Sequence, residues 1–202
     1  MLLILISPPE TILQEHQILI SLFNQGLQIF HLRKPDYSEA ELETYILQIP
    51  EEFHTRIVIH SHYRLASKYN LKGIHLTEKV KNGASLSFIL QNLNNKSISA
   101  SFHAAEELTQ SCGNYNYIFL SPIFDSISKY GYKSRFNLNE LKQLLSTIYQ
   151  RPHPPQIVAL GGISEQNIHL VKEAGFNGIA LLGTIWQSSN PLSAFQKVQA
   201  AL

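Results

Sequence analysis

The clearest sign of the fold is the segment Gln156-Ile157-Val158-Ala159-Leu160-Gly161-Gly162-Ile163-Ser164, an apolar run followed by two glycines and a helix-capping serine. A nearly continuous apolar run is typical of a strand that is buried on both faces of a parallel sheet. The two glycines suit a tight turn, and Ser164 can open a helix that closes at Gly175. The stretch therefore predicts a strand followed directly by a helix.

The same pattern recurs along the chain. The apolar runs are Leu2–Ile6, Leu27–Leu32, Arg56–His60, Gly73–Leu76, Ser97–Ser101, Tyr115–Leu120, Gln156–Leu160 and Gly178–Leu182. Helices are predicted between them, among them Thr11–Gln25, Glu39–Ile49 with a capping box from Ser38 and Glu41, and a short one over Ala84–Asn92. Eight strand–helix units in 202 residues predict a single compact (β/α)8 TIM barrel, with residues 1–202 as one domain. A doubly wound open sheet is the alternative.

Composition excludes several classes of protein. Lys plus Arg number 16 against 15 Asp plus Glu, so no basic excess is present to bind a nucleic acid. The apolar run Met1–Ile6 ends at Ser7-Pro8-Pro9-Glu10, far short of a membrane span. A single cysteine, Cys112, cannot form an internal disulfide. We therefore expect a cytoplasmic protein that binds no membrane, with apolar surface left for a homo-oligomer interface.

Polar residues gather where the predicted strands end. In a barrel of this type those ends converge on one site, so these residues are the candidates for binding and catalysis. The candidate ligand-binding residues are His31, Arg33, His60, Ser61 and Ser101, together with Ser126, Ser128 and Lys129 in the long segment 121–137. An irregular segment of that length is more often an active-site lid than a disordered loop.

Two glycine turns predict a phosphate site. Gly161-Gly162 follows the seventh predicted strand, and Leu182-Gly183 follows the eighth. Glycines allow the backbone to approach an anion, and the N–H groups at a helix start point towards it. The loops after strands seven and eight are the recurrent phosphate site of this fold.

His103 is the candidate catalytic residue. It follows the fifth predicted strand, and a histidine can give and take protons near pH 7. The alternative is that it only caps the helix that begins with Glu106 and Glu107.

His60-x-His62 has the spacing of a metal-ligand pair. A zinc hydrolase would need further ligands at other strand ends. Asp125, after the sixth predicted strand, is the carboxylate that the sequence pattern locates at such an end. The other interpretation is that His60, Ser61 and His62 form hydrogen bonds to a heterocycle, and on that interpretation no metal is expected.

Seven segments in order resemble the thiamine phosphate synthase superfamily. They are His31-Leu32-Arg33, Ile59-His60-Ser61-His62 with Leu65-Ala66, Gly73-Ile74-His75-Leu76, Ser101-Phe102-His103 with Glu106-Glu107, Tyr117–Phe124 with Ser126, Ser128 and Lys129, Ala159–Ile163, and Ala174–Ala180. The resemblance implies a thiamine-biosynthesis enzyme that binds a thiazole phosphate.

The superfamily contains two reactions. Its synthases couple a pyrimidine diphosphate to a thiazole phosphate and release pyrophosphate, with Mg²⁺ bound by two aspartates. Those aspartates would fall near Ser61 and after Leu76, where this chain has Ser61 and Thr77-Glu78. Its tautomerases isomerise a thiazole carboxylate phosphate by moving a proton with the histidine of the Ser-x-His segment, here His103. The resemblance therefore favours a tautomerase that needs no cofactor, with Arg33 as the partner of the carboxylate.

Two alternatives remain at this point. One is a true thiamine-phosphate synthase, a transferase that requires Mg²⁺. The other is a protein that binds thiazole phosphate for regulation and has lost catalysis.

Overall fold

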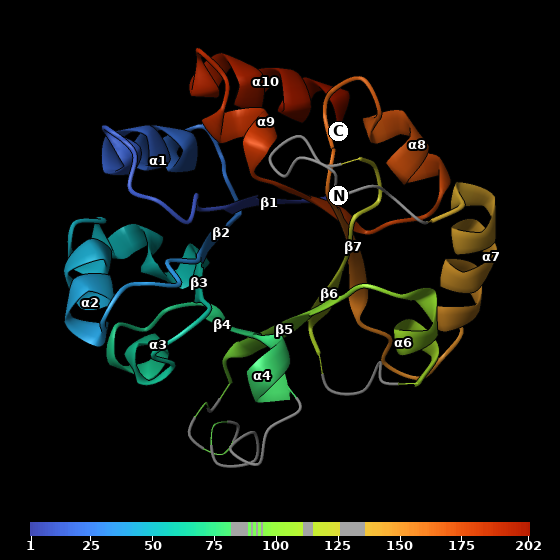
Figure 1. The fold of residues 1–202 in the computed structure, drawn as a ribbon, viewed down its shortest axis with the longest axis horizontal. Helices are drawn as coiled ribbons and strands as arrows, with labels where there is room; N and C mark the ends of the chain where they lie inside the picture. Colours follow the sequence, from blue (N-terminus) through green and yellow to red (C-terminus); the bar gives the residue numbers. More distant parts are fainter. Residues whose placement is uncertain (82–88, 90, 92, 94, 111–114, 126–135) are drawn as a thin grey trace. The chain divides into compact units, whose positions relative to one another are not determined.

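The computed structural model describes residues 1–81, 89, 91, 93, 95–110, 115–125 and 136–202 (Figure 1). The strands are β1 (Leu2–Ile6), β2 (Ile29–Leu32), β3 (Ile57–Ile59), β4 (Gly73–Leu76), β5 (Ser97–Phe102), β6 (Tyr117–Leu120), β7 (Gln156–Leu160) and β8 (Gly178–Leu181). They pair in sequence order and close into a barrel, and the printed pairs are all parallel. The predicted (β/α)8 barrel is confirmed.

Helices separate these strands. They are α1 (Glu15–Asn24), α2 (Glu39–Leu47), α3 (Arg64–Lys68), α4 (Glu78–Lys81), α6 (Ala105–Gln110), α7 (Leu138–Ile148), α8 (Ile168–Glu173), α9 (Gly183–Trp186) and α10 (Pro191–Ala201), with a 3₁₀ helix over Glu51–Arg56. No helix in the described ranges is long and apolar enough to cross a membrane. Most of the predicted helix Ala84–Asn92 lies outside the described residues.

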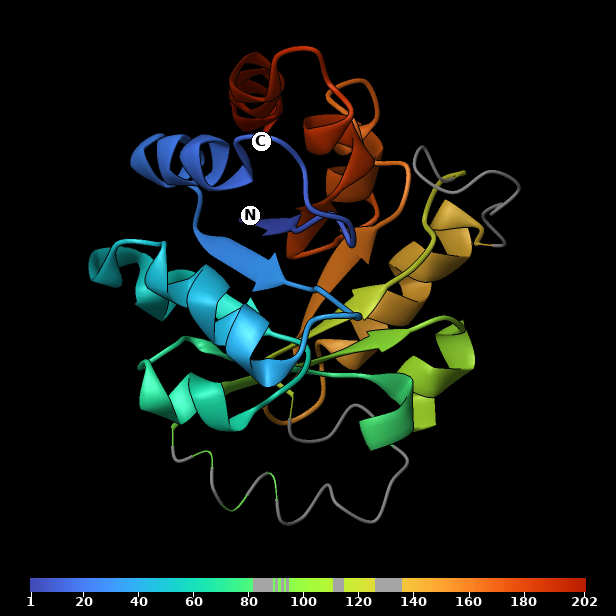
Figure 2. The ribbon, with the colours of Figure 1, turned by 60° about the vertical axis from the view of Figure 1, so that its left-hand side comes forward.

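The chain divides into two compact units. The N-terminal unit is Leu5–Ala100, and the C-terminal unit combines Met1–Ile4 with Ser101–Leu202. In the N-terminal unit α2 and α3 flank the strands β2 to β4 (Figure 1). In the C-terminal unit α7 and α8 run alongside β6 and β7 (Figure 2), and α10 packs against α8 and α9.

Two helices begin later than the sequence predicts. α1 begins at Glu15 rather than Thr11, because Gln14 adopts a left-handed conformation with φ 60° that a continuous helix cannot contain. α8 begins at Ile168 rather than Ser164, because Asn167 Oδ1 accepts from the Ser164 N–H (2.9 Å) and holds residues 164–167 in a turn. The capping box of α2 is confirmed, since Ser38 and Glu41 bond each other's backbone N–H.

Candidate functional site

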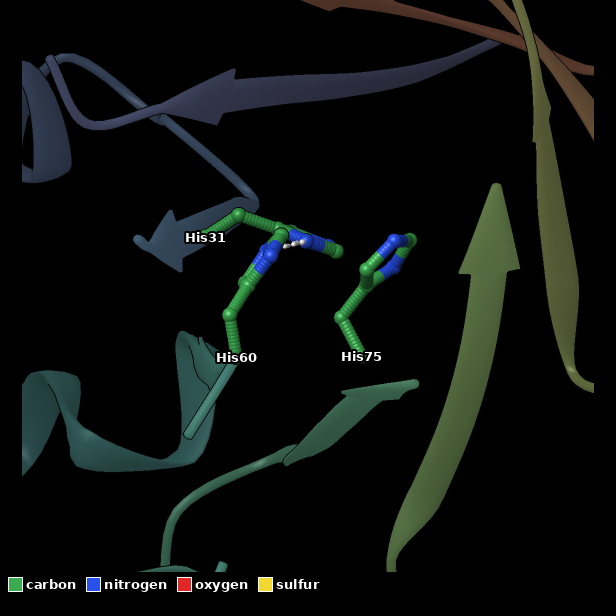
Figure 3. Close-up of side chains that lie close together, drawn as sticks. All are labelled: His31, His60 and His75. Atoms are coloured by element: carbon green, nitrogen blue, oxygen red, sulfur yellow. Dashed lines mark hydrogen bonds between the residues drawn. The ribbon is translucent and has the colours of Figure 1, made fainter. Parts of the chain in front are cut away.

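Three histidines of the N-terminal unit lie together (Figure 3). His31 is in β2, His60 directly follows β3, and His75 is in β4. Nδ1 of His31 and Nε2 of His60 are hydrogen-bonded at 3.0 Å. The rings of His60 and His75 stack with their centroids 4.3 Å apart, and the His31 ring meets both edge-on.

The register of the parallel strands explains this cluster. His31 pairs with Val58, and Val58 pairs with Gly73. Paired residues share a face of the sheet, and so do residues two apart on one strand. His60 and His75, two residues beyond Val58 and Gly73, therefore lie on the same face as His31.

Burial holds these imidazoles in their neutral form. Loss of hydration lowers the pKa of His31 and of His60 well below the ordinary value, and the nearby His75 adds to the effect on both. Burial, followed by the positive charges of Arg33 and Lys81, lowers the pKa of His75 to about 3. The cluster therefore offers neutral nitrogen donors and acceptors at pH 7.

Ser99 of β5 determines the tautomer of His75. The strand register sets the two residues opposite one another, and Nδ1 of His75 lies 2.9 Å from the Ser99 Oγ. The Ser99 hydroxyl donates its single proton to the Ile74 carbonyl at 3.3 Å. Nδ1 of His75 must therefore donate to Oγ, which leaves the nitrogen lone pair on Nε2.

The predicted residue Arg33 directly follows β2, and two hydrogen bonds fix the position of its backbone. Its N–H donates to the Ser7 Oγ at 2.8 Å, and the Ser7 hydroxyl donates back to the Arg33 carbonyl at 3.0 Å. The next residue, Lys34, is fully buried and pairs with Glu15 at 2.8 Å, where Tyr45 also donates to the carboxylate. Lys34 thus stabilises the fold and is not available to bind a substrate.

His62 does not belong to the cluster. It adopts φ 50°, and its Nε2 lies 3.0 Å from the Tyr37 carbonyl while Nδ1 faces Glu39 at 3.8 Å. The His60-x-His62 pair that the spacing indicated is therefore not formed. The histidine whose ring stacks on His60 is His75. His75 is not among the residues predicted to bind a ligand, although a histidine within the apolar run Gly73–Leu76 is a signal for such a role.

The candidate catalytic residue lies in the C-terminal unit. Nδ1 of His103 is 3.1 Å from the Ser121 carbonyl and 3.3 Å from the Ser121 Oγ. Because a carbonyl only accepts, Nδ1 carries the proton and Nε2 carries the lone pair. Glu107 caps α6 by accepting from the N–H groups of His103 (2.8 Å) and Ala104 (3.0 Å). The side chain of His103 is exposed to solvent.

The glycines predicted to bind phosphate, Gly161 and Gly162, are also required by the backbone conformation. Gly161 and Gly162 adopt φ 98° and 64°. A Cβ on Gly161 would lie 2.8 Å from the Pro122 Cβ, and one on Gly162 would lie 2.3 Å from the Asp125 carbonyl oxygen. Glycine is therefore needed here for the close approach of residues 122–125, whether or not an anion binds.

The two glycine turns are joined to each other. The Thr184 hydroxyl donates to the Ile163 carbonyl, so the turn after β7 contacts the start of α9. α9 begins after Leu182 without a side-chain cap, and its first residue is the predicted Gly183. Backbone N–H groups at such an uncapped start can bind an anion.

The other predicted residues are less informative. Ser61 lies two residues after β3 and Ser101 lies within β5, and both are partly buried. Ser126, Ser128 and Lys129 lie outside the described residues, as does most of the predicted lid 121–137.

Comparison with known sequences identifies the family. The sequence model of the TMP-TENI family, described as thiamine monophosphate synthase, matches residues 3–185. This chain belongs to that family.

Individual relatives of the family match over almost the whole chain. The thiamine-phosphate synthase of Flavobacterium psychrophilum is 26% identical over 201 residues, which cover 98% of this chain and 97% of the relative. A solved thiamine phosphate pyrophosphorylase from Bacteroides thetaiotaomicron is 32% identical with a TM-score of 0.80 and covers 100% of this chain and 97% of its own. One from Pyrococcus furiosus has a TM-score of 0.78 at 16% identity, covers 98% of this chain and 94% of its own, and supports the fold alone.

The Mg²⁺ ion of the family's synthases does not fit the residues described at the predicted metal positions. Mg²⁺ prefers oxygen ligands, usually carboxylates and water. Ser61 supplies only a hydroxyl, and the side chain of Glu78 is 61% exposed and pairs with Lys81 at 3.1 Å. The cluster beside them consists of imidazole nitrogens, which are poor ligands for Mg²⁺.

Proposed function

We propose that this chain isomerises a thiazole phosphate by proton transfer, as a tautomerase of the thiamine monophosphate synthase family. The observation that carries the proposal is the ordered, solvent-accessible imidazole of His103. Family membership supports the substrate class, and the choice of proton transfer depends on this chain's own residues.

His103 acts as the base in this proposal. The Ser121 carbonyl holds the imidazole proton on Nδ1, so Nε2 is the nitrogen that removes a proton from the thiazole ring. The imidazolium formed then returns that proton to another ring atom. Because Nδ1 keeps its hydrogen bond to Ser121 throughout, the His103 imidazole does not need to rotate between the two steps. A general base in this position contributes a rate factor of about 10² to 10⁴.

The phosphate is held by backbone N–H groups. Gly161, Gly162, Leu182 and Gly183 supply two turns that the Thr184–Ile163 hydrogen bond joins. This arrangement needs no excess of basic residues, in agreement with a formal net charge of +1.

The synthase reaction is the second candidate, and the names of the relatives favour it. The Flavobacterium and Bacteroides proteins are named for coupling or pyrophosphorylase chemistry, at 26% and 32% identity. The residues at the predicted Mg²⁺ positions are the reason that we rank proton transfer first, because pyrophosphate release normally depends on a cation that neutralises the leaving group.

Two assays on the purified chain decide between these reactions. The first follows isomerisation of the thiazole carboxylate phosphate without added metal, and the second follows thiamine phosphate formation from both synthase substrates with Mg²⁺. We expect turnover in the first alone, reduced about 10² to 10⁴-fold in His103→Ala. His169→Ala, an exposed histidine of α8, is the matched control and should keep full activity.

The opposite results have equally clear meanings. Thiamine phosphate formation would establish the synthase reaction and overturn the proposal. Full isomerisation by His103→Ala would remove His103 from the mechanism. Binding of thiazole phosphate without turnover in either assay would identify a non-catalytic binding protein.

A further inference from the structure

We propose that His31, His60 and His75 form a binding site for one divalent transition-metal ion of the zinc class. The proposal concerns the N-terminal unit alone and does not depend on the proposed function. One ligand nitrogen from each imidazole lies within 4.8 Å of the other two. Figure 3 shows the three side chains converging from three separate strand segments.

The distances are close to those of a metal-bound set. Two nitrogens bound to zinc at about 2.0–2.1 Å and at the tetrahedral angle are about 3.4 Å apart. The His31–His60 pair, at 3.0 Å, needs to open by only a few tenths of an ångström. The remaining separations are at most 4.8 Å, so the nitrogens must come closer by at most about 1.4 Å when a metal binds.

The metal would replace the hydrogen atom that His31 and His60 share. In the apo form one of these two facing nitrogens carries the proton of the hydrogen bond. To bind a metal, that imidazole moves its proton to its other ring nitrogen, so both facing nitrogens present lone pairs. No net proton is released, and both rings remain neutral ligands.

Ser99 supplies the outer support that metal-bound histidines usually have. A ligand histidine generally donates its second N–H to a fixed acceptor, which sets the ring orientation and the tautomer. Nδ1 of His75 donates to the Ser99 Oγ at 2.9 Å, and that hydroxyl is itself committed to the Ile74 carbonyl. His75 is therefore already in the tautomer that binds through Nε2.

The donor set selects the kind of metal. Three imidazoles suit zinc, cobalt, nickel or copper, whereas Mg²⁺ and Ca²⁺ prefer oxygen. Three neutral ligands cancel none of the metal's charge, and Arg33 adds positive potential at His60 and His75. The fourth coordination position is therefore suited to an anion, such as hydroxide or a carboxylate.

The experiment uses the full chain without a histidine tag. After dialysis against a chelator, the protein is titrated with Zn²⁺ by calorimetry and with Co²⁺ by visible absorption, in the presence of millimolar Mg²⁺. We expect one Zn²⁺ per chain, and Co²⁺ absorption bands of a tetrahedral nitrogen site that Zn²⁺ displaces.

Variants assign the ion to the cluster. His60→Gln and His75→Gln should each weaken binding at least 100-fold, and Ser99→Ala should weaken it about 10 to 100-fold by releasing His75. His62→Gln is the matched control, because His62 is near His60 in sequence and bonded elsewhere, and it should bind as the wild type does. Circular dichroism of each variant checks that it is folded.

Three results would overturn the proposal: no stoichiometric binding to the wild-type chain, equal binding by folded His60→Gln and His75→Gln, or full displacement by Mg²⁺. Because these titrations contain no thiazole phosphate, their failure leaves the proposed function standing, and failure of the isomerisation assay leaves the metal site standing.

Discussion

Acid should destabilise this protein well above the pH at which its carboxylates titrate, and the buried histidines are the cause. His31 and His75 are 0% and 3% exposed, and burial lowers the pKa of each. In the unfolded chain the same side chains have a pKa of about 6.5. Below that pH the unfolded state binds protons that the folded state does not, so the free energy of unfolding falls as the pH falls.

The magnitude follows from the two pKa values. For a histidine that stays neutral in the folded state down to a pKa of about 3, lowering the pH from 7 to 5 costs about 2 kcal/mol. The His75 loss alone is a substantial part of a typical total of about 5–15 kcal/mol, and His31, whose pKa burial also lowers well below the ordinary value, adds to it. The loss begins near pH 6.5 and continues until the folded state itself takes up a proton.

Urea unfolding at pH 7, 6 and 5 in the presence of a chelator measures this effect. In His75→Gln one of the protonation events is absent, so the loss between pH 7 and 5 should be about 2 kcal/mol smaller than in the wild type. His169→Gln alters an exposed histidine of α8 and should keep the wild-type slope. An unchanged dependence of stability on pH in His75→Gln would contradict this prediction, since His75 would then not resist protonation in the folded state.

Two further predictions concern stability. Lys34→Met leaves the buried carboxylate of Glu15 without its ion-pair partner and should lower the free energy of unfolding in urea by about 3–5 kcal/mol. The double variant Lys34→Met/Glu15→Leu should recover most of that loss. A double variant as unstable as the single one would contradict this prediction. Gly162→Ala should cost about 1–3 kcal/mol more than Gly175→Ala in thermal unfolding, because both have positive φ but only Gly162 would place its Cβ against the Asp125 carbonyl oxygen. Equal losses would show that the Asp125 contact relaxes freely.

Much of the fold could be predicted from local pattern. The runs Gly73–Leu76 and Gln156–Leu160 were predicted as strands, and the structure has the same bounds. Continuous apolar runs are informative because both faces of a barrel strand are buried. The start of α1 was wrong by four residues, since nothing in the residue types from Thr11 onwards shows that Gln14 adopts a left-handed conformation.

The candidate site could be predicted only in part. His31 and His60 are predicted from their places at or near the ends of apolar runs, and the structure brings them together. His62 was paired with His60 because the two are near in sequence, but the chain turns at His62 and directs it to Tyr37. The His60 ring stacks instead on His75, fifteen residues away along the chain.

The order of strands and helices, the barrel class and the family can all be inferred from the sequence, because each depends on residues that are close together along the chain. Which side chains meet depends on the folded arrangement of the chain. Parallel strand register placed His31, His60 and His75 on one face, and burial made them neutral. Burial likewise pairs Lys34 with Glu15, so Lys34 is part of the core. Such contacts depend on register and desolvation, which act between segments that are distant in sequence.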